Sequence, residues 1–365
     1  MERMSLRVLF AGGGTGGHLF PGIAVARTLV NRYPDAEIVF VGTGRGVEGR
    51  TVMKEGFAFK RIRSAGLLGK SITGRLYALL LAPVTLLDTV RILLQTRPDL
   101  VVGLGGYSAG PVVLLASLIG KTTMLLEQNA VPGMTNRLLA SFVKAAAVSY
   151  EGTAMFFGDK AFVSGNPVRK GFFDDSDFQV ITSRRPHLLV VGGSQGAHAI
   201  NEAMVAAAPV IAQISGGIEI THQTGMADVD TVRAAYRLVK IDAKVECFFD
   251  LMEEEMRAAD LVVCRAGATT LAEVAAAGRP SLIVPFPHAT YDHQRSNAQV
   301  MVDAGSAELI DEKDLGASFE TRLLDLIGNR ERLQAMSQAA FRLARPDAAE
   351  TIVDRVTELL GQSTS

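Results

Sequence analysis

Three glycine-rich turns constrain this chain more than any other feature. They are Gly12-Gly13-Gly14-Thr15-Gly16-Gly17-His18, Gly103-Leu104-Gly105-Gly106-Tyr107 and Gly192-Gly193-Ser194-Gln195-Gly196. Each follows a short apolar run and precedes a stretch that can form a helix, so each predicts a strand, a tight turn and a helix N-terminus. Glycine lets the backbone approach a ligand closely, while N–H groups and the helix dipole favour an anion. The turns therefore indicate phosphate binding in an α/β protein.

The first turn alone fits the G-x-G-x-x-G pattern of dinucleotide-binding oxidoreductases, through Gly12, Gly14 and Gly17. That class needs an acidic residue about 20 residues further on, at the end of the next strand, to bind the ribose. Here the nearest acidic residues, Asp35 and Glu37, come before the next apolar run instead of after it. The spacing therefore disfavours a nicotinamide-dependent dehydrogenase.

The length of 365 residues suits two domains. Strand-like and helical runs alternate, which predicts parallel sheets covered on both faces. The expected strands are 7–11, 38–41, 100–104, 123–126 and 145–149, and then 187–191, 219–222, 244–248, 261–264 and 281–284. We expect two doubly wound domains facing a central cleft, over 1–166 and 167–345, with a final helix in 346–365 that could pack back on the first domain.

Charge is divided unevenly between the halves, although the formal net charge is only −1. The first 165 residues carry 18 basic and 10 acidic side chains, and the rest carry 19 and 28. A basic half favours an anionic ligand or an acidic membrane surface. Nucleic acid is disfavoured because Trp is absent and no aromatic residues are interleaved with the basic ones.

The two cysteines, Cys247 and Cys264, have no metal-ligand spacing and lie in apolar runs, so buried free thiols in a reducing compartment are expected. The histidines show no metal-binding pattern, and we expect no metal and no cofactor. The N-terminal residues lead directly into the first strand without the pattern of a signal peptide, which favours the cytoplasm.

Residues 76–87 are apolar almost all round and are flanked by Arg61, Arg63, Lys70, Arg75 and Arg91. Twelve residues are too few to span a bilayer as a helix. Basic flanks are typical of a surface that enters a headgroup layer. The alternative is a buried helix pair broken at Pro83. The pattern leaves both interpretations open.

Polar and charged residues that suit ligand chemistry are densest between Cys264 and Asn297. Arg265 and Gly267 leave a strand where a helix begins, so they could hold a diphosphate. Glu273 lies further inside that helix, where its carboxylate could accept hydrogen bonds from a ribose diol or could simply be solvated. In the first half, His18 closes the first turn at a helix start, and a neutral imidazole there could act as a general base.

Six motifs, in order and over nearly the whole chain, together resemble the MurG family. They are Gly13 to Pro21, Gly105-Gly106-Tyr107, Glu127-Gln128-Asn129, Gly165 to Arg169, Gly192 to Ala197, and the block from Cys264 to Asn297. The resemblance implies a GT-B fold and an inverting N-acetylglucosaminyltransferase of the cytoplasmic membrane face. Its donor would be UDP-N-acetylglucosamine, and its acceptor undecaprenyl-pyrophosphoryl-N-acetylmuramyl-pentapeptide (lipid I), converted to lipid II. Other cell-wall synthesis proteins would be its possible partners.

The resemblance also assigns roles to individual positions. His18 is the expected base, with the muramyl 4-hydroxyl as nucleophile. The acceptor would be bound by Gly14, Gly105, Gly106 and Tyr107. The donor would be bound by Thr15, Gly16, Gly17, Asn129, Arg169, Ser194, Phe249, Arg265, Gly267, Ala268, Thr269, Thr270, Leu271, Ala272, Glu273, Gln294 and Asn297. Phe249 replaces a smaller aliphatic residue at a position that meets uracil through its backbone, and the role of His293 stays open.

Two alternatives accompany this interpretation. An epimerase of UDP-N-acetylglucosamine would share the donor site but would need no lipid acceptor, and the apolar surface between Lys70 and Arg97 speaks against it. A protein that binds sugar nucleotides or lipid phosphates without catalysis would keep the glycine turns and lack turnover.

Overall fold

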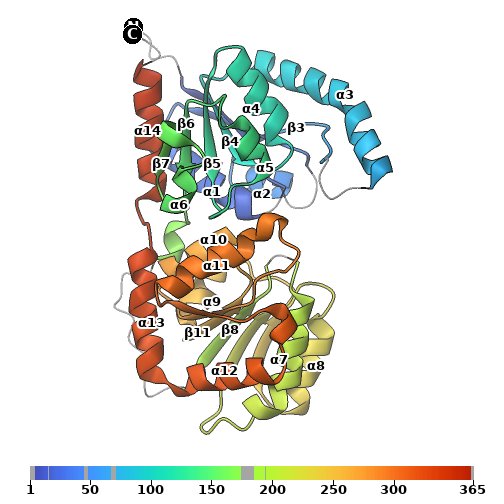
Figure 1. The fold of residues 1–365 in the computed structure, drawn as a ribbon, viewed down its shortest axis with the longest axis vertical. Helices are drawn as coiled ribbons and strands as arrows, with labels where there is room; N and C mark the ends of the chain where they lie inside the picture. The colour runs from blue at the N-terminus through green and yellow to red at the C-terminus, as the bar shows by residue number, and fades with distance from the viewer. Residues whose placement is uncertain are drawn as a thin grey trace. The chain divides into compact units, whose positions relative to one another are not determined.

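The computed structural model describes residues 5–14, 16–44, 48–66, 71–173, 185–193 and 195–362. The chain divides into two compact units (Figure 1). Unit 1 takes in Met1–Val168 and Asp347–Ser365, and unit 2 takes in Arg169–Pro346. Residues 347–362 therefore complete the first unit after the second has intervened in the sequence.

Unit 1 is built on a seven-stranded parallel sheet in the order β3-β2-β1-β4-β5-β6-β7. Its strands are β1 (Arg7–Gly12), β2 (Glu37–Gly42), β3 (Ala58–Arg61), β4 (Leu100–Gly105), β5 (Thr122–Glu127), β6 (Ala145–Val148) and β7 (Ala161–Val163). Its helices are α1 (Gly16–Arg32), α2 (Glu48–Lys54), α3 (Ile72–Thr96), α4 (Ala109–Leu118), α5 (Met134–Leu139), α6 (Glu151–Ala154) and α14 (Ala348–Gln362), with a short 3-10 turn at Gly158–Lys160.

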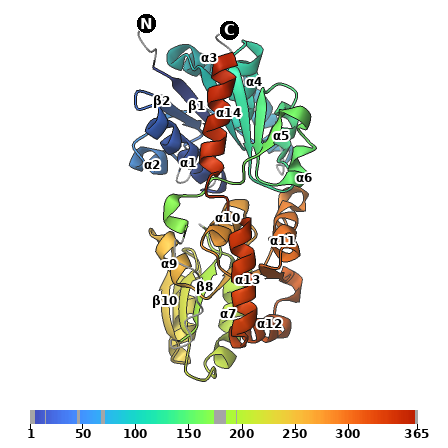
Figure 2. The same ribbon diagram turned by 90° about the vertical axis from the view of Figure 1, so that its left-hand side faces the viewer.

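Both faces of this sheet are buried, which explains why its strands are nearly continuous apolar runs. On one face, Phe10 and Phe40 stack with ring centroids 4.9 Å apart. This face is covered by α1 and by α14, which contributes Ile352, Val353 and Val356 to the core (Figure 2). The opposite face packs mainly against α3, α4 and α5. The two layers hold the carboxyl ends of β1, β4 and β5 at one edge of the sheet, where the glycine turns follow.

Unit 2 repeats the same winding with six strands in the order β10-β9-β8-β11-β12-β13. Its strands are β8 (His187–Val191), β9 (Glu219–Gln223), β10 (Asp242–Glu246), β11 (Leu261–Cys264), β12 (Ser281–Ile283) and β13 (Ala307–Leu309). Its helices are α7 (His198–Ile211), α8 (Val229–Leu238), α9 (Met252–Ala258), α10 (Ala268–Ala276), α11 (His293–Asp303), α12 (Ala317–Gly328) and α13 (Arg330–Leu343). Three 3-10 turns complete it: η2 (Lys170–Phe172), η3 (Thr290–Asp292) and η4 (Glu312–Asp314).

All ten strands expected from the sequence form, and the doubly wound α/β class is confirmed. The strand expected at 244–248 begins two residues earlier, at Asp242. Three further strands, β3, β7 and β13, were not expected. Each has only three or four residues, too short a run for an alternating or apolar pattern to emerge.

Helix α3 corrects one of the two interpretations of the apolar segment. It is one helix of 25 residues that runs through Pro83, so the expected helix pair broken at Pro83 is wrong, and the helix is longer than the twelve-residue apolar run. By length and composition alone it could cross a membrane, which is weak evidence by itself. One face packs on unit 1 through Thr89, Ile92 and Leu93, while Leu80 and Leu87 are 71% and 68% exposed.

Candidate active site

The first two glycine turns interlock at the carboxyl edge of the sheet in unit 1. Gly12 has φ +111°, and a Cβ there would lie 2.2 Å from the carbonyl oxygen of Gly105. Gly105 and Gly106 also have positive φ, and a Cβ on Gly106 would meet the Gly13 oxygen at 3.2 Å. Since side chains cannot fit at such distances, glycine is needed for the two turns to approach each other.

The buried carboxylate of Glu48, at the start of α2, binds the backbone of the first glycine turn. Its side chain is 1% exposed and accepts hydrogen bonds from the N–H of Gly14 and, at 2.9 Å, from the N–H of Gly44. The Thr43 hydroxyl donates to the same carboxylate at 3.3 Å. Glu48 thereby joins the turn after β1 to the loop after β2. The sequence pattern did not indicate the contact with the first turn, because Gly14 lies 34 residues away along the chain.

His18 lies in the first turn of α1, half-buried, with its ring against Gly105 at the second glycine turn. Its Nδ1 is 2.8 Å from the side-chain oxygen of Gln128, which follows β5. Tyr107, after the second turn, is 40% exposed. The structure therefore brings the expected base to the same sheet edge as the glycine turns.

Asn129 is held at this edge by its neighbour Glu127. Its backbone N–H and its side-chain amide both donate to Glu127 Oε1, at 3.0 and 3.2 Å. The other Glu127 oxygen accepts from Gly133 N–H and from the Asn136 amide. Gly16 and Gly17 open α1 beside the first turn. Two of the expected donor contacts, Thr15 and Ser194, lie outside the described residues.

The glycine turn of unit 2 is packed against backbone. A Cβ on Gly192 would lie 2.2 Å from the nitrogen of Ala197, and one on Gly196 would lie 1.9 Å from the oxygen of Thr224. The buried Gln223 side chain connects this turn to the next loop: its amide donates to the Gly193 oxygen at 3.0 Å, and it accepts from the Phe249 N–H at 2.9 Å. Because the Phe249 N–H is engaged, a backbone contact to uracil would fall to the Phe249 carbonyl.

Glu273, on α10, shares its surroundings with Arg169 and Glu253. Burial raises the pKa of Glu273 to about 7, although Arg169 lowers that pKa, and Glu253 adds to the increase. Arg169 Nη2 lies 3.2 Å from Glu253 Oε2, and its guanidinium stacks over Phe172 at 5.1 Å. Glu273 is therefore not a fully solvated helix residue, because its side chain is half-buried and desolvation is the main cause of the raised pKa.

Arg265 does not present a free guanidinium to a diphosphate. It forms an ion pair with Glu312 and donates to the carbonyls of Val284 and Pro285, both at 3.2 Å. Only 13% of its side chain is exposed. We therefore revise the expected diphosphate contact. Arg265 connects the loop after β12 to η4, and its partner there, Glu312, lies 47 residues after Arg265 in the sequence.

The structure at the start of α10 reduces the number of residues that can contact a diphosphate. Its first turn, Ala268 to Thr270 after Gly267, directs N–H groups out of the helix end. Leu271 N–H already bonds to the Gly267 oxygen at 2.9 Å and the Leu271 side chain is 1% exposed, so this residue is no diphosphate contact. Ala272 comes one residue deeper in the helix.

Gln294 and Asn297, on α11, both support the loop that precedes α10. Gln294 Oε1 accepts from the N–H groups of Ala266 and Phe286, at 3.2 and 2.9 Å. Asn297 is fully buried and donates to the Ala266 oxygen at 3.1 Å, so we revise its expected sugar contact to a supporting one. His293 Nδ1 lies 2.7 Å from the Thr290 oxygen.

Among the described residues, no group of three or more His, Cys, Asp or Glu side chains is placed to hold a metal ion. Both cysteines are free, and burial raises the pKa of the Cys264 thiol to about 12.

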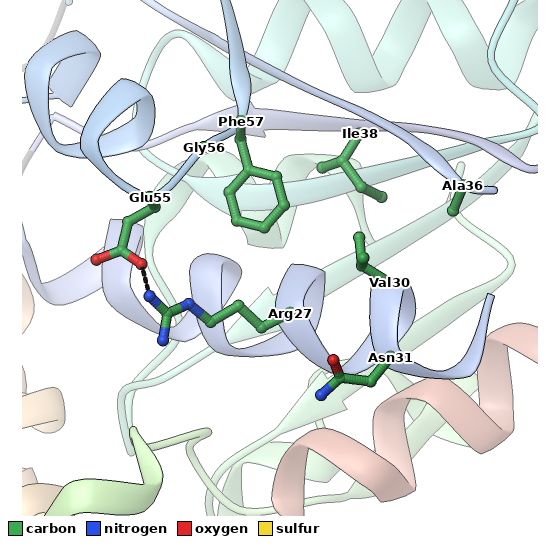
Figure 3. A pocket seen from close by; sticks show the side chains of 8 residues that line it. All are labelled: Arg27, Val30, Asn31, Ala36, Ile38, Glu55, Gly56 and Phe57. Carbon is green, nitrogen blue, oxygen red and sulfur yellow. Dashed lines mark hydrogen bonds and ion pairs between the residues drawn. The ribbon is translucent and has the colours of Figure 1, made fainter. Parts of the chain in front are cut away.

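Unit 1 also has a hollow of about 590 Å³ away from these turns (Figure 3). It is lined by the Arg27–Glu55 ion pair, the Phe57 ring and neighbouring side chains. Ala36 and Phe57 directly precede β2 and β3, so the hollow lies at the amino ends of these strands. Doubly wound sheets bind ligands beyond the carboxyl ends, and the glycine turns therefore remain the candidate site.

Comparison with known proteins agrees with this architecture. Residues 8–148 match the N-terminal domain of glycosyltransferase family 28, and residues 187–352 match its C-terminal domain. The chain is 45% identical over 357 residues to a protein of Anaeromyxobacter sp. (strain K), covering 97% of this chain and 93% of the relative. A Myxococcus xanthus protein is 42% identical over 360 residues, covering 98% and 94%. Both are named UDP-N-acetylglucosamine--N-acetylmuramyl-(pentapeptide) pyrophosphoryl-undecaprenol N-acetylglucosamine transferase.

Among solved structures, Acinetobacter baumannii MurG superposes with a TM-score of 0.77 at 30% identity, covering 97% of this chain and 99% of that one. A UDP-N-acetylglucosamine 2-epimerase superposes with a TM-score of 0.70 at 12% identity, covering 99% and 97%, which shows a shared fold alone. The two doubly wound sheets and their glycine turns define a GT-B glycosyltransferase. The chain belongs to the MurG family.

Proposed function

We propose that this chain carries out its family's reaction at the carboxyl-edge turns described above. It is a hexosyltransferase that transfers N-acetylglucosamine from UDP-N-acetylglucosamine to lipid I, giving lipid II in peptidoglycan synthesis. The observation that carries this assignment is the identity of 45% to a relative of that name over nearly the full chain. The interlocked glycine turns and His18 supply a site for the chemistry.

The reaction is a single displacement at the anomeric carbon, with inversion. The muramyl 4-hydroxyl attacks, its proton passes to the imidazole of His18, and the bond to UDP breaks. A positioned base of this kind contributes roughly 10²- to 10⁴-fold to the rate. Negative charge grows on the departing diphosphate, and the N–H groups at the start of α10 are preorganised to stabilise it.

Residues of unit 2 bind the nucleotide in this proposal. Glu273 accepts from the ribose hydroxyls, Arg169 contacts the nucleotide, and the Phe249 backbone meets uracil. Gly267 to Thr270 face the diphosphate, together with Ser194. The Gln294 side-chain oxygen is already bonded to the N–H groups of Ala266 and Phe286, which leaves its amide nitrogen to contact the sugar in this proposal.

Residues of unit 1 bind the acceptor and the transferred sugar. Gly14, Gly105, Gly106 and Tyr107 hold the acceptor pyrophosphate. Thr15, Gly16, Gly17 and Asn129 contact the donor sugar. The positive charge of the first half of the chain suits a doubly charged lipid substrate.

Incubation with radiolabelled UDP-N-acetylglucosamine, with and without lipid I, tests the reaction. We expect label in lipid only when the acceptor is present, and a product with the opposite anomeric configuration by NMR. Isomerisation of the sugar nucleotide without acceptor would instead identify an epimerase. Tight binding of UDP-N-acetylglucosamine with no turnover would identify a binding protein.

The second proposal concerns where the enzyme works: we propose that α3 holds unit 1 on an anionic membrane surface. Four leucines, Leu76, Leu80, Leu87 and Leu94, follow one another at helical spacing and are 56% to 71% exposed. Such a stripe would enter the headgroup layer while the opposite face stays packed on unit 1. Arg63 stays at the helix flank, paired with Asp88 at 2.7 Å, and this pair lowers the pKa of Asp88.

Vesicle flotation with anionic phosphatidylglycerol tests the membrane contact. The double substitution Leu80→Glu, Leu87→Glu should lower the bound fraction at least tenfold, because two apolar side chains worth roughly 1.5 to 3 kcal/mol each no longer enter the bilayer. Turnover of a soluble acceptor analogue should stay within twofold. Leu238→Glu, which changes an exposed leucine on α8, is the control. Unchanged flotation of the double variant would exclude α3 as the contact.

A further inference from the structure

Gln128 is buried beside the expected base and has no role in the mechanism so far. It directly follows β5, at the carboxyl edge of the sheet in unit 1, and its side chain is 2% exposed. Its Oε1 lies 2.8 Å from Nδ1 of His18, a normal hydrogen-bond length. The two residues are 110 positions apart in the sequence, so the contact exists only in the folded unit.

This contact selects one form of the neutral imidazole. A carboxamide oxygen only accepts hydrogen bonds, so His18 Nδ1 must carry the proton. A neutral imidazole has a single N–H, and its other nitrogen, Nε2, then holds the lone pair. A general base needs that free lone pair where the hydroxyl proton leaves.

We infer that Gln128 is a positioning residue, which fixes the imidazole ring of His18 and keeps Nε2 as its basic nitrogen. The inference rests on the proposed role of His18 as base. Gln128 itself touches neither reacting atom, and it acts through the orientation and the tautomer of the ring.

The two buried carboxylates in the same part of unit 1, Glu127 and Glu48, have hydrogen-bond partners other than His18. Glu127 is saturated by Asn129, Gly133 and Asn136, and Glu48 is bound by the Gly14 and Gly44 N–H groups. The group that faces Nδ1 is therefore a neutral amide, which orients the ring without a counter-charge.

The other end of the Gln128 amide supports its place in a working site. Within the part of the chain that the structure describes, Gln128 Nε2 is buried and has no hydrogen-bond partner. A buried donor left unpaired is unfavourable, so native proteins keep few of them. An acceptor oxygen of a bound substrate, or a water molecule, would supply the missing hydrogen-bond partner of Gln128 Nε2.

Nuclear magnetic resonance of the imidazole nitrogens tests the tautomer directly. Protein labelled with ¹⁵N-histidine gives two-bond correlations that distinguish an Nδ1 proton from an Nε2 proton, and His18→Gln identifies the signal. We expect the Nδ1-protonated form in the parent protein and a mixture in Gln128→Met, which removes the acceptor at similar volume. An Nε2-protonated parent would overturn the inference, because the amide nitrogen would then face the ring.

Kinetics with a soluble lipid I analogue give a second, independent readout. Gln128→Met should lower kcat roughly 10- to 100-fold, as expected when a base loses its tautomer, and leave KM for UDP-N-acetylglucosamine within twofold. Gln128→Glu should keep measurable turnover and move the acid limb of the kcat/KM profile to higher pH, because a carboxylate stabilises the protonated ring. An unchanged profile in Gln128→Glu would overturn the inference.

Two controls separate this inference from the proposed function. Gln213→Glu introduces the same charge at an exposed glutamine of unit 2 and should leave the profile unchanged. In a His18→Ala background, Gln128→Met should cause no further loss. If His18→Ala itself stays active, the proposed base is wrong, whereas an inactive His18→Ala with no effect of either Gln128 substitution rejects the inference alone.

Discussion

The glycine turn after β1 in unit 1 and the turn after β8 in unit 2 occupy the same position in two sheets of the same strand order, but different side chains hold them. In unit 1 a buried carboxylate, Glu48, accepts from the N–H of Gly14. In unit 2 a buried amide, Gln223, donates to the carbonyl of Gly193. The first contact uses a backbone donor of the turn, and the second uses a backbone acceptor.

The two turns also differ in what stands beside them. The unit 1 turn leads into a helix whose first turn carries His18, a group able to take a proton. The unit 2 turn also leads into a helix that opens with a histidine, His198, but this imidazole is 70% exposed and pairs with the Asp228 carboxylate at 3.0 Å. The comparison teaches that one winding pattern supplies a catalytic turn in one unit and a binding turn in the other, through a few side chains outside the glycine motif.

Removing the proposed base of unit 1 should have the largest effect of the substitutions considered. His18→Ala should lower kcat on a soluble lipid I analogue at least 10²-fold, because no other group takes the proton. UDP affinity, measured by calorimetry, should stay within twofold, since the nucleotide is assigned to unit 2. Turnover within about threefold of the parent would show that the unit 1 turn has no catalytic role of this kind.

Glu273 tests whether unit 2 binds through an ionisable group. Its pKa of about 7 means that the carboxylate forms as pH rises through that value, and an ionised acceptor bonds ribose hydroxyls more strongly. UDP affinity should therefore increase from pH 6 to pH 8, and Glu273→Gln should remove this dependence and weaken binding about tenfold at pH 8.

The raised pKa of Glu273 also predicts that the stability of the ligand-free protein changes with pH. The folded-state pKa of Glu273 is raised above its ordinary value of 4.5, so the folded state favours the protonated form. That stabilisation is complete below pH 4.5 and is lost as pH rises through about 7. Thermal unfolding of the parent, compared with Glu273→Gln, should show this loss. A constant difference across the range would contradict the raised pKa.

Gln223→Glu tests the amide that holds the unit 2 turn. The substituted carboxylate can still accept from Phe249 N–H but cannot donate to the Gly193 carbonyl, and its charge opposes a diphosphate. UDP affinity should fall about fivefold, with kcat at saturating donor little changed. Titration by calorimetry measures the first quantity, and equal affinity would mean that the turn keeps its shape without this bond.

Glu48→Gln is the reciprocal change in unit 1, with the smallest expected effect. The amide oxygen can replace only one of the two carboxylate oxygens that accept from Gly14 and Gly44, so the connection between the turn after β1 and the loop after β2 is lost. We expect kcat/KM for the acceptor to fall about threefold and UDP affinity to stay unchanged. A rise in acceptor affinity would instead show that Glu48 competes with the pyrophosphate for Gly14.

Most of the fold could be predicted from local patterns in the sequence. The long apolar strands and the glycine turns are local signals, and each was found within a residue or two. Pro83 misled because a proline inside an apolar run usually ends a helix. Here the carbonyl that Pro83 leaves without its helical partner belongs to Leu79, which is 65% exposed, so water can satisfy it.

The candidate site was less predictable because its decisive contacts are distant in sequence. Arg265 has the residue type and position of a phosphate ligand, but Glu312 neutralises it from 47 residues away. Asn297 stands in a polar helix, but its amide turns inward to Ala266. Neither partner follows from spacing. His18 lies beside the glycine turns because it stands at the start of the helix that directly follows the first turn. The surroundings of Glu273 depend on Arg169, which is distant in sequence.

The return of α14 to unit 1 has a consequence for biosynthesis. A ribosome completes the sequence of unit 2 before it reaches Ile352, Val353 and Val356, which cover one face of the unit 1 sheet. Until then, that nascent face lacks its last layer and exposes apolar surface, the condition under which intermediates aggregate or recruit chaperones. Maturation of the two units is thus coupled by the order of translation, and the final helix acts as the closing step for a domain begun some 340 residues earlier.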